Sequence, residues 1–335
     1  MKKAEKVMVA IDCIVYNHEP YIRQCLEGFV MQKTTFPFVA IVHDDASTDK
    51  SADIIREYAE RYPDIIYPVY EIENQYSKRD KSLTKIRKRE IDRFNPKYIA
   101  FCEGDDYWID PLKLQKQVDI LEKNEEYGMC YTNFDIFYHE TGIFKHALLT
   151  NSDDIRYKTD ITIYDWLKNP GYLGPMSWVV RKDLWLKNYI QCLDGTFVTV
   201  ADFLVNSKMY CLKDEVTSVY RSHKGSVTQS NSFRTQFLRA RSMFKTTKKL
   251  SELYLTDSVK RKNVEDMSFK RFYSIGNFYK ILCYGSKEEI HNLKRIENLS
   301  FIQILFLRLS KFDIWHNIFV YLYKYYVHYR TGLDV

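Results

Sequence analysis

The chain has 335 residues, enough for one large domain or two modest ones. With 45% apolar and 28% charged residues and only 11 glycines and 8 prolines, its composition excludes disordered, collagen-like and linker-dominated proteins. The formal net charge of +6 is uneven, because residues 236–335 carry 18 Lys and Arg against 9 Asp and Glu. This distribution predicts a slightly acidic body followed by a basic tail.

The cysteines and the amino-terminal segment indicate in which cellular compartment the protein is expected. The seven cysteines are odd in number and include no CxxC pair, which argues against a zinc knuckle and a disulfide framework. Most lie in apolar stretches, so we expect free thiols and a reducing, cytoplasmic compartment. The first apolar run is short and is interrupted by Asp12, which favours a strand over a signal peptide. No uncharged apolar run is long enough to predict a transmembrane helix.

The first part of the chain alternates between strand and helix patterns. Four apolar segments are predicted to form strands: 7–15, 38–42, 65–70 and 98–102. Helices are predicted at 21–31 and from the Ser47-Thr48-Asp49 cap to about Tyr62, whereas 73–88 is a polar loop leading into a helix. The βαβαβ order predicts a parallel sheet with right-handed crossovers and helices on both faces.

The remainder mixes strands with helices and ends in a helical tail. Strands are predicted at 129–138 and 176–180. Helices are predicted at 111–124, 164–167 and 200–211. From about Arg234 onward the pattern is helical and basic. We therefore expect a body of residues 1–233 and a basic, aromatic-rich helical region of residues 234–335.

The clearest chemical signal is the sequence FCEGDDYWIDP, in which carboxylates directly follow a buried strand. Glu103, Asp105 and Asp106 are expected at the edge where open α/β sheets bind ligands. Adjacent carboxylates repel one another unless a cation lies between them and an anion. A Mg²⁺ or Mn²⁺ ion shared with a diphosphate meets that requirement, with Asp105 and Asp106 as ligands. The alternative is a solvated acidic turn, and Asp110 is assigned to the start of the next helix.

Two other loops are expected at the same edge. In VHDDASTD, Asp45 follows the second strand and can accept an N–H from a nucleobase, while the residues after it cap the next helix. The loop from Tyr16 to Pro20 follows the first strand and lines the cleft of any doubly wound sheet. His18 in that loop is by itself more typical of a surface or structural histidine.

Three segments in this order resemble glycosyltransferase family 2 over roughly residues 6–230: IVYNHEPYIRQCLEGFVMQK, VHDDASTDKS and YIAFCEGDDYWIDPLKLQKQ. The resemblance implies an α/β GT-A fold, a Rossmann-like mixed sheet flanked by helices, with the helical region as an extension. It implies that the first loop and Asp45 hold the nucleobase, usually uracil. The first-loop residues concerned are Tyr16, Asn17 and Glu19. The acidic motif, with Glu103 in place of the usual first Asp, is implied to hold ribose and a divalent ion, Asp106 being the preferred metal ligand.

The resemblance also implies a catalytic base further along the chain. In TFVTVADFLVNSKM, Asp202 is the only carboxylate and is expected to be the base, against the alternative of a charge at a helix N-terminus. Asp194 is the second candidate. VYRSHKGSVTQ resembles a family segment with a histidine near the metal, so His223 is a candidate ligand, or else a hydrogen-bonding loop histidine. Arg221 or Lys224 can offset phosphate charge.

The implied reaction is inverting transfer of a sugar from a UDP-sugar to a hydroxyl of a glycan or lipid-linked acceptor in bacterial surface polysaccharide synthesis. Residues 169–178 are expected to contact the acceptor, with Tyr172 or Trp178 either stacking on a sugar or packing in the core. A nucleotidylyltransferase is an alternative, but it would need a Gly-rich phosphate loop that Tyr16 to Pro20 lacks. The other alternative is a non-catalytic scaffold that binds a membrane or nucleic acid. The long apolar face argues against nucleic acid.

Residues 301–329 are apolar and aromatic but interrupted by charges. They are too polar to span a bilayer and favour a helix lying at the membrane interface, with basic residues upstream attracting anionic lipid. The alternative is a cap or a homodimer contact that buries the same aromatic face. We therefore expect a cytoplasmic protein whose tail meets either the inner face of the plasma membrane or a second copy.

Overall fold

A computed structural model of the chain describes residues 6–147, 160–187, 190, 192–224, 226, 232–310 and 313–331. The chain divides into two compact units. The first comprises residues 1–162, 171–189 and 199–223, and the second comprises 163–170, 190–198 and 224–335. The second unit thus takes in two short segments that a boundary after residue 233 assigns to the body.

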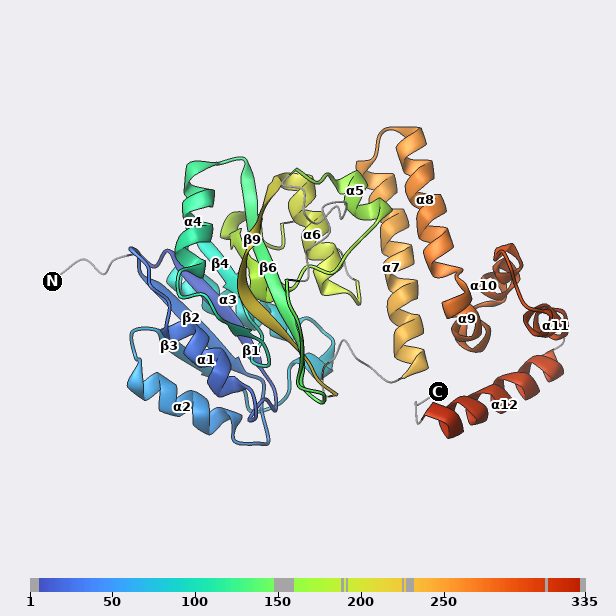
Figure 1. The fold of residues 1–335 in the computed structure, drawn as a ribbon, viewed down its shortest axis with the longest axis horizontal. Coiled ribbons are helices and arrows are strands. Elements are labelled where there is room, and N and C mark those ends of the chain that lie inside the picture. Colours follow the sequence, from blue (N-terminus) through green and yellow to red (C-terminus); the bar gives the residue numbers. More distant parts are fainter. Residues whose placement is uncertain are drawn as a thin grey trace. The chain divides into compact units, whose positions relative to one another are not determined.

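A mixed sheet forms the frame of the first unit (Figure 1). Its strands are β1 (Val9–Val15), β2 (Phe38–Asp44), β3 (Ile66–Tyr70), β4 (Tyr98–Phe101), β5 (Tyr107–Trp108), β6 (Tyr127–Tyr138), β7 (Ile143–Lys145), β8 (Trp178–Arg181) and β9 (Lys208–Ser222). They follow the order β3-β2-β1-β4-β8-β6-β9-β5, with β7 beside β6. The strands β1 to β4 are parallel, whereas β8 is antiparallel to both of its neighbours. The predicted Rossmann-like mixed sheet is confirmed.

Helices cover both faces of this sheet. Their bounds are α1 (Ile22–Val30), α2 (Ser51–Arg61), α3 (Ser82–Phe94) and α4 (Lys113–Lys123). Apolar residues of α1, α2 and α4 share one buried cluster with Ile11 and Cys13 of β1. The side chain of Asp12 points to the other face because successive strand residues alternate, and there it meets Arg87 of α3. The helices α1, α2 and α4 therefore lie on one face and α3 on the other.

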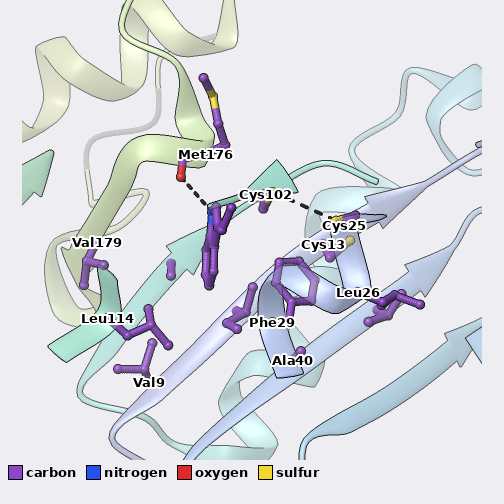
Figure 2. Packing of buried hydrophobic residues seen from close by; sticks show 14 of the residues in the cluster. Val9, Cys13, Cys25, Leu26, Phe29, Ala40, Cys102, Leu114, Met176 and Val179 are labelled. Carbon is purple, nitrogen blue, oxygen red and sulfur yellow. Dashed lines mark hydrogen bonds between the residues drawn. The ribbon is translucent and has the colours of Figure 1, made fainter. Parts of the chain in front are cut away.

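Trp108 anchors the short strand β5 in the core. Its ring packs edge-on against Phe29, with centroids 5.0 Å apart, and its Nε1–H donates to the Met176 carbonyl oxygen at 2.9 Å (Figure 2). A Cβ at Gly28 would lie 2.9 Å from the backbone nitrogen of Trp108, so glycine is needed for α1 to approach β5 this closely. The chain that follows the acidic loop between β4 and β5 is consequently held in the core.

One predicted helix has the wrong bounds. The sequence predicts a helix at 200–211, but α6 spans Gly195–Asn206 and the chain then enters the long strand β9. β9 pairs in parallel with β6 along its whole length, from Tyr127 opposite Lys208 to Tyr138 opposite Ser222. Apolar periodicity does not separate a buried strand from a buried helix over so few residues, and the pairing partner is remote in the sequence.

The second unit is helical, as predicted for the tail. It contains α5 (Ile163–Lys168), α7 (Phe233–Tyr254), α8 (Ser258–Phe272), α9 (Phe278–Tyr284), α10 (Lys287–Asn292), α11 (Phe301–Leu309) and α12 (Asp313–Thr331). Ser286 and Ser300 begin α10 and α11 with capping boxes completed by Glu289 and Gln303. Within the described residues, no helix is both long enough and apolar enough to cross a bilayer.

The first unit buries an amine in its core. Lys113, at the start of α4, is fully buried, and its Nζ donates to Gln117 Oε1 and lies 4.7 Å from the centroid of the Trp108 ring. Burial lowers the pKa of Lys113 to about 7. The folded chain therefore releases this proton well before the unfolded chain does.

We expect Lys113→Met to change how the free energy of unfolding depends on pH. Between about pH 7 and 10.5 the unfolded wild type binds the proton and the folded wild type does not, so this group adds stability as pH rises. The free energy of unfolding of the wild type should therefore rise, relative to that of Lys113→Met, by about 1.4 kcal/mol per pH unit. Urea unfolding from about pH 7 to pH 9 measures it. Lys123→Met, at an exposed position of α4, is the control, and a pH-independent difference for Lys113→Met would contradict the buried amine.

Candidate active site

The acidic loop lies at the point where the strand order reverses. From β1 the sheet continues to β2 and β3 on one side, and from β4 to β8 on the other. Open α/β sheets bind ligands at such a switch point, outside the carboxyl ends of the strands. The loops after β1 and β4 meet there, since the Gly104 N–H donates to the Ile14 carbonyl oxygen at 2.9 Å. A Cβ at Gly104 would lie 2.9 Å from His18 Nδ1, so glycine permits this approach.

The first loop braces the start of α2. Asn17 Oδ1 accepts the Thr48 N–H at 2.7 Å, and Glu19 Oε2 accepts the Lys50 N–H at 3.1 Å. Tyr16 is 43% exposed at the rim. Of the three first-loop residues expected to contact the nucleobase, two therefore join this loop to the next one, and Tyr16 presents a ring to solvent.

Asp45 holds the loop after β3. Its side chain is buried, and its two oxygens accept the N–H groups of Gln75 at 2.7 Å and Tyr76 at 3.0 Å. The Asp45 N–H in turn donates to the Val15 carbonyl oxygen at 2.8 Å. The carboxylate expected at the nucleobase thus links the segments that follow β1, β2 and β3.

The two aspartates of the acidic loop are buried side by side, whereas Glu103 is exposed. Asp105 Oδ2 lies 3.0 Å from His223 Nε2, and its Oδ1 is buried without a hydrogen-bond partner among the described residues. Asp106 Oδ1 accepts the Arg221 N–H at 2.8 Å. The structure therefore brings together Asp105, Asp106, His223 and Arg221, which the sequence predicts separately.

The two neighbouring carboxyl groups differ in their pKa. Burial raises the pKa of Asp105, but the hydrogen bond to His223, together with the electrostatic effects of His18 and His223, outweighs burial and holds the pKa below its usual value. Burial and then the charge of Asp105 raise the pKa of Asp106 well above its usual value. Such a pair is fully ionised only when a cation offsets the repulsion.

A shared metal ion fits these groups. Within the described part of the chain, no group of three or more His, Cys, Asp or Glu side chains is arranged to hold a metal ion by itself. Mg²⁺ in phosphate sites is commonly bound by only one or two carboxylates, with phosphates and water completing its shell. Two observations suit an ion held in that way: the Oδ1 of Asp105 is buried without a partner among the described residues, and the pKa of the neighbouring Asp106 is raised.

Arg221 brings positive charge to the same place. Its Nε–H donates to the Asp105 carbonyl oxygen at 2.8 Å and its Nη2–H to Gln24 Oε1 at 2.6 Å. The guanidinium carbon lies 5.0 Å from the ring centroids of both Tyr21 and Tyr107. These contacts orient a buried cation next to the acidic pair.

A buried ion pair lies beneath the switch point, and sequence reasoning missed it. Arg87 Nη2 lies 2.6 Å from Asp12 Oδ2, and the Asp12 side chain is 2% exposed. The signal was Asp12 itself, because a carboxylate inside an apolar strand requires a partner. Arg87 stood in a charge-dense segment, where nothing in the sequence distinguished it from its neighbours.

Comparison with known proteins identifies the family, because residues 13–185 match Glycosyl transferase family 2. The chain belongs to glycosyltransferase family 2. A protein of Mycobacterium tuberculosis is 41% identical over 132 residues, which are 39% of this chain and 36% of that protein. This chain thus matches about a third of the length of that relative.

Two solved structures are similar in fold. TarS of S. aureus, solved with UDP-GlcNAc, has a TM-score of 0.59 at 15% identity, covering 86% of this chain and 79% of that one. The mannosyltransferase PcManGT of Pyrobaculum calidifontis, solved with GDP-Man and Mn²⁺, has a TM-score of 0.54 at 14% identity, covering 95% and 90%. These likenesses confirm the GT-A fold.

The two candidates for the family 2 base lie in different settings. Asp202 is in the interior of α6, and its Oδ1 accepts an N–H from Asn206 Nδ2 at 3.1 Å. Asp194 precedes α6, and its Oδ1 accepts the Phe197 N–H at 2.9 Å. The alternative of a helix N-terminal charge therefore describes Asp194 and not Asp202.

The aromatic residues expected to stack on the acceptor pack inside the first unit. Trp178 is 2% exposed. Tyr172 makes edge contacts with Phe134 at 6.0 Å and Tyr220 at 5.4 Å between ring centroids. The core alternative therefore describes Trp178, whereas Tyr172 is half-buried at the edge of the core.

Proposed function

We propose that the protein transfers a sugar, with inversion, from a nucleotide-sugar to a hydroxyl of a glycan or lipid-linked acceptor in bacterial surface polysaccharide synthesis. The observation that carries this proposal is the buried pair Asp105 and Asp106 at the switch point, next to the guanidinium of Arg221. Carboxylates that need a cation, beside a fixed positive charge, suit a leaving diphosphate. Membership of family 2 favours glycosyl transfer over nucleotidyl transfer.

The proposed donor is a UDP-sugar. Support comes from the fold shared with TarS, which was solved with UDP-GlcNAc. Tyr16 would stack on the base from the rim, while Asn17, Glu19 and Asp45 would shape its site through the three loops they join. Glu103 is exposed at the end of β4, within reach of solvent and of a ribose hydroxyl in this proposal.

The proposed cofactor is Mg²⁺ or Mn²⁺, held by Asp105 and Asp106. The PcManGT complex, which contains GDP-Man and Mn²⁺, supports this choice. Such an ion supplies positive charge to the leaving diphosphate. His223 is proposed as a further ligand, a role that requires its Nε2 to exchange Asp105 Oδ2 for the ion.

The proposed base is Asp202. A carboxylate that removes the acceptor proton during attack on the anomeric carbon contributes about 10²–10⁴-fold to the rate. One base and one direct displacement invert the anomeric configuration. In this proposal Arg221 stabilises the negative charge that develops on the leaving diphosphate.

We expect Asp106→Ala to abolish transfer and Mn²⁺-dependent UDP binding while the fold survives, because the change removes a proposed metal ligand but none of the apolar residues of the core. Isothermal titration with UDP in the presence and absence of Mn²⁺, together with a UDP-release assay, measures both effects. Asp110→Ala, at the start of α4, is the control and should bind UDP normally. Wild-type activity of Asp106→Ala with Mn²⁺ would show that the metal assignment is wrong.

Asp202→Asn is expected to leave UDP-sugar binding nearly intact and to lower turnover by about 10²-fold or more, since only proton removal is lost. Single-turnover transfer rates and donor affinity separate the two effects. The comparison variant is Asp194→Asn, in which the amide oxygen still accepts the Phe197 N–H. Normal turnover in Asp202→Asn with a loss in Asp194→Asn would move the base to Asp194.

We propose that the protein is cytoplasmic and docks on the inner face of the plasma membrane through α12. Phe319, Tyr323 and Val327 face inward, and the first two pack against Tyr279 of α9. The opposite face of the helix is also apolar and is exposed: Ile314 74%, Trp315 54%, Ile318 46%, Tyr321 71%, Leu322 58%, Tyr325 67% and Tyr329 79%. Tyr and Trp are the residues favoured at the headgroup level, and the net charge of +9 in residues 236–335 complements anionic lipid.

Binding to vesicles should therefore depend on this outer face and on salt. We expect the full chain to sediment with phosphatidylcholine vesicles containing phosphatidylglycerol, less so at high salt, and Ile314→Glu/Leu322→Glu to stay in solution. Ile72→Glu, at a position 99% exposed in the first unit, is the matched control. Equal sedimentation of all three proteins would contradict docking through α12. A change from dimer to monomer in the double variant, seen by light scattering, would support the dimer alternative instead.

A further inference from the structure

Two exposed rings are stacked on the β6–β7 hairpin. The ring of Phe144, 42% exposed, stacks on Phe137 with centroids 4.5 Å apart and an interplanar angle of 30°. The imidazole of His146 is parallel to the Phe144 ring, with centroids 5.6 Å apart and an interplanar angle of 4°. The His146 side chain is 74% exposed, so this stack presents flat faces and edges to solvent.

A buried carboxylate holds the outer ring in place. Asp135, whose side chain is 10% exposed, contacts His146 Nδ1 through Oδ2 at 2.8 Å and accepts the Ala147 N–H through Oδ1 at 2.8 Å. Ala147 adopts the left-handed conformation, with φ of 45°, which a non-glycine residue adopts at a cost. A solvent-exposed imidazole that is fixed in this way is preorganised for a partner rather than free to rotate.

The stack leads directly to the acidic pair. Phe137 of β6 is paired with Phe144 of β7 on one side and with Arg221 of β9 on the other, so the three side chains form a row across three strands. The guanidinium carbon of Arg221 lies 5.4 Å from the Phe137 ring centroid. The Arg221 N–H donates to Asp106, which completes a continuous path from solvent to the proposed metal ligands.

The row lies on the side of the acidic loop that faces away from the nucleobase. In the sheet, β2 and Asp45 are on one side of β4, and β6, β7 and β9 are on the other. A donor whose base lies near Asp45 and whose diphosphate lies at Asp105 and Asp106 would fill the first side. The acceptor must then approach from the second, an argument that rests on the proposed function.

We propose that Phe144 and His146 form the platform that binds a sugar ring of the acceptor. The C–H face of a pyranose packs on a flat aromatic face, and its hydroxyl groups form hydrogen bonds at the rim, where His146 offers Nε2. Sites that bind sugars combine apolar faces with a few positioned polar groups in this manner. Trp178 lies in the core and Tyr172 is half-buried against it, so this row adds a solvent-facing surface to the acceptor segment expected from the sequence.

Saturation-transfer NMR on the full chain with UDP and Mn²⁺ tests the platform. The probes are the methyl glycosides of glucose, galactose, N-acetylglucosamine, mannose and rhamnose. We expect at least one to bind the wild type, and Phe144→Ala and His146→Ala each to weaken that binding about tenfold. Ile143→Ala is the matched control, because Ile143 is 59% exposed on the same strand but its side chain points to the other face of the hairpin.

The outcomes separate this inference from the proposed function. If no glycoside binds the wild type, or if Phe144→Ala and Ile143→Ala bind equally well, the platform is wrong. UDP binding by titration calorimetry is measured on the same samples and reports on the donor site alone. Loss of glycoside binding in Phe144→Ala with UDP affinity unchanged supports the platform. Absence of UDP binding in the wild type would overturn the proposed donor site but would leave the glycoside comparison valid.

Discussion

Two buried carboxylates placed next to one another, Asp105 and Asp106, are the constraint on which the rest of the site depends. Their repulsion in a low-dielectric setting is costly, and each is therefore given its own partner: His223 for Asp105 and the Arg221 N–H for Asp106. Arg221 lies in β9, a strand distant in sequence, and His223 directly follows that strand. The long parallel pairing of β9 with β6 thus brings both partners to the acidic loop.

The same region is rigid for reasons of packing and hydrogen bonding. Trp108 holds the chain after the acidic loop in the core, and Gly104 lets the loop approach the end of β1. Asn17, Glu19 and Asp45 join the loops after the first three strands. Loops that are cross-linked in this way hold a binding site in one geometry, so less order has to be imposed when the ligand arrives.

The cysteines near this region serve packing. All seven are free thiols, and Cys13, Cys25 and Cys102 are buried together behind the acidic loop (Figure 2). The sulfur atoms of Cys25 and Cys102 are 4.0 Å apart, and burial raises the pKa of Cys102 to about 11. A thiol with a raised pKa is a poor nucleophile, which agrees with the expectation of small core residues.

The sequence by itself determined the order of β1 to β4 and their helices, because apolar runs and helix periodicity are local, and it identified the acidic loop from residues adjacent in the chain. Only the tertiary structure decided that 208–222 is a strand, since its pairing with β6 is what distinguishes it from a helix. The resemblance to family 2 implied that Asp45, Asn17 and Glu19 face a ligand, but the structure revealed that their oxygens hold neighbouring loops. The partnership of Asp12 with Arg87 and the stack of Phe137, Phe144 and His146 likewise depend on long-range pairing and strand register. Those are set by the burial of the whole sheet, which no single segment of the sequence encodes.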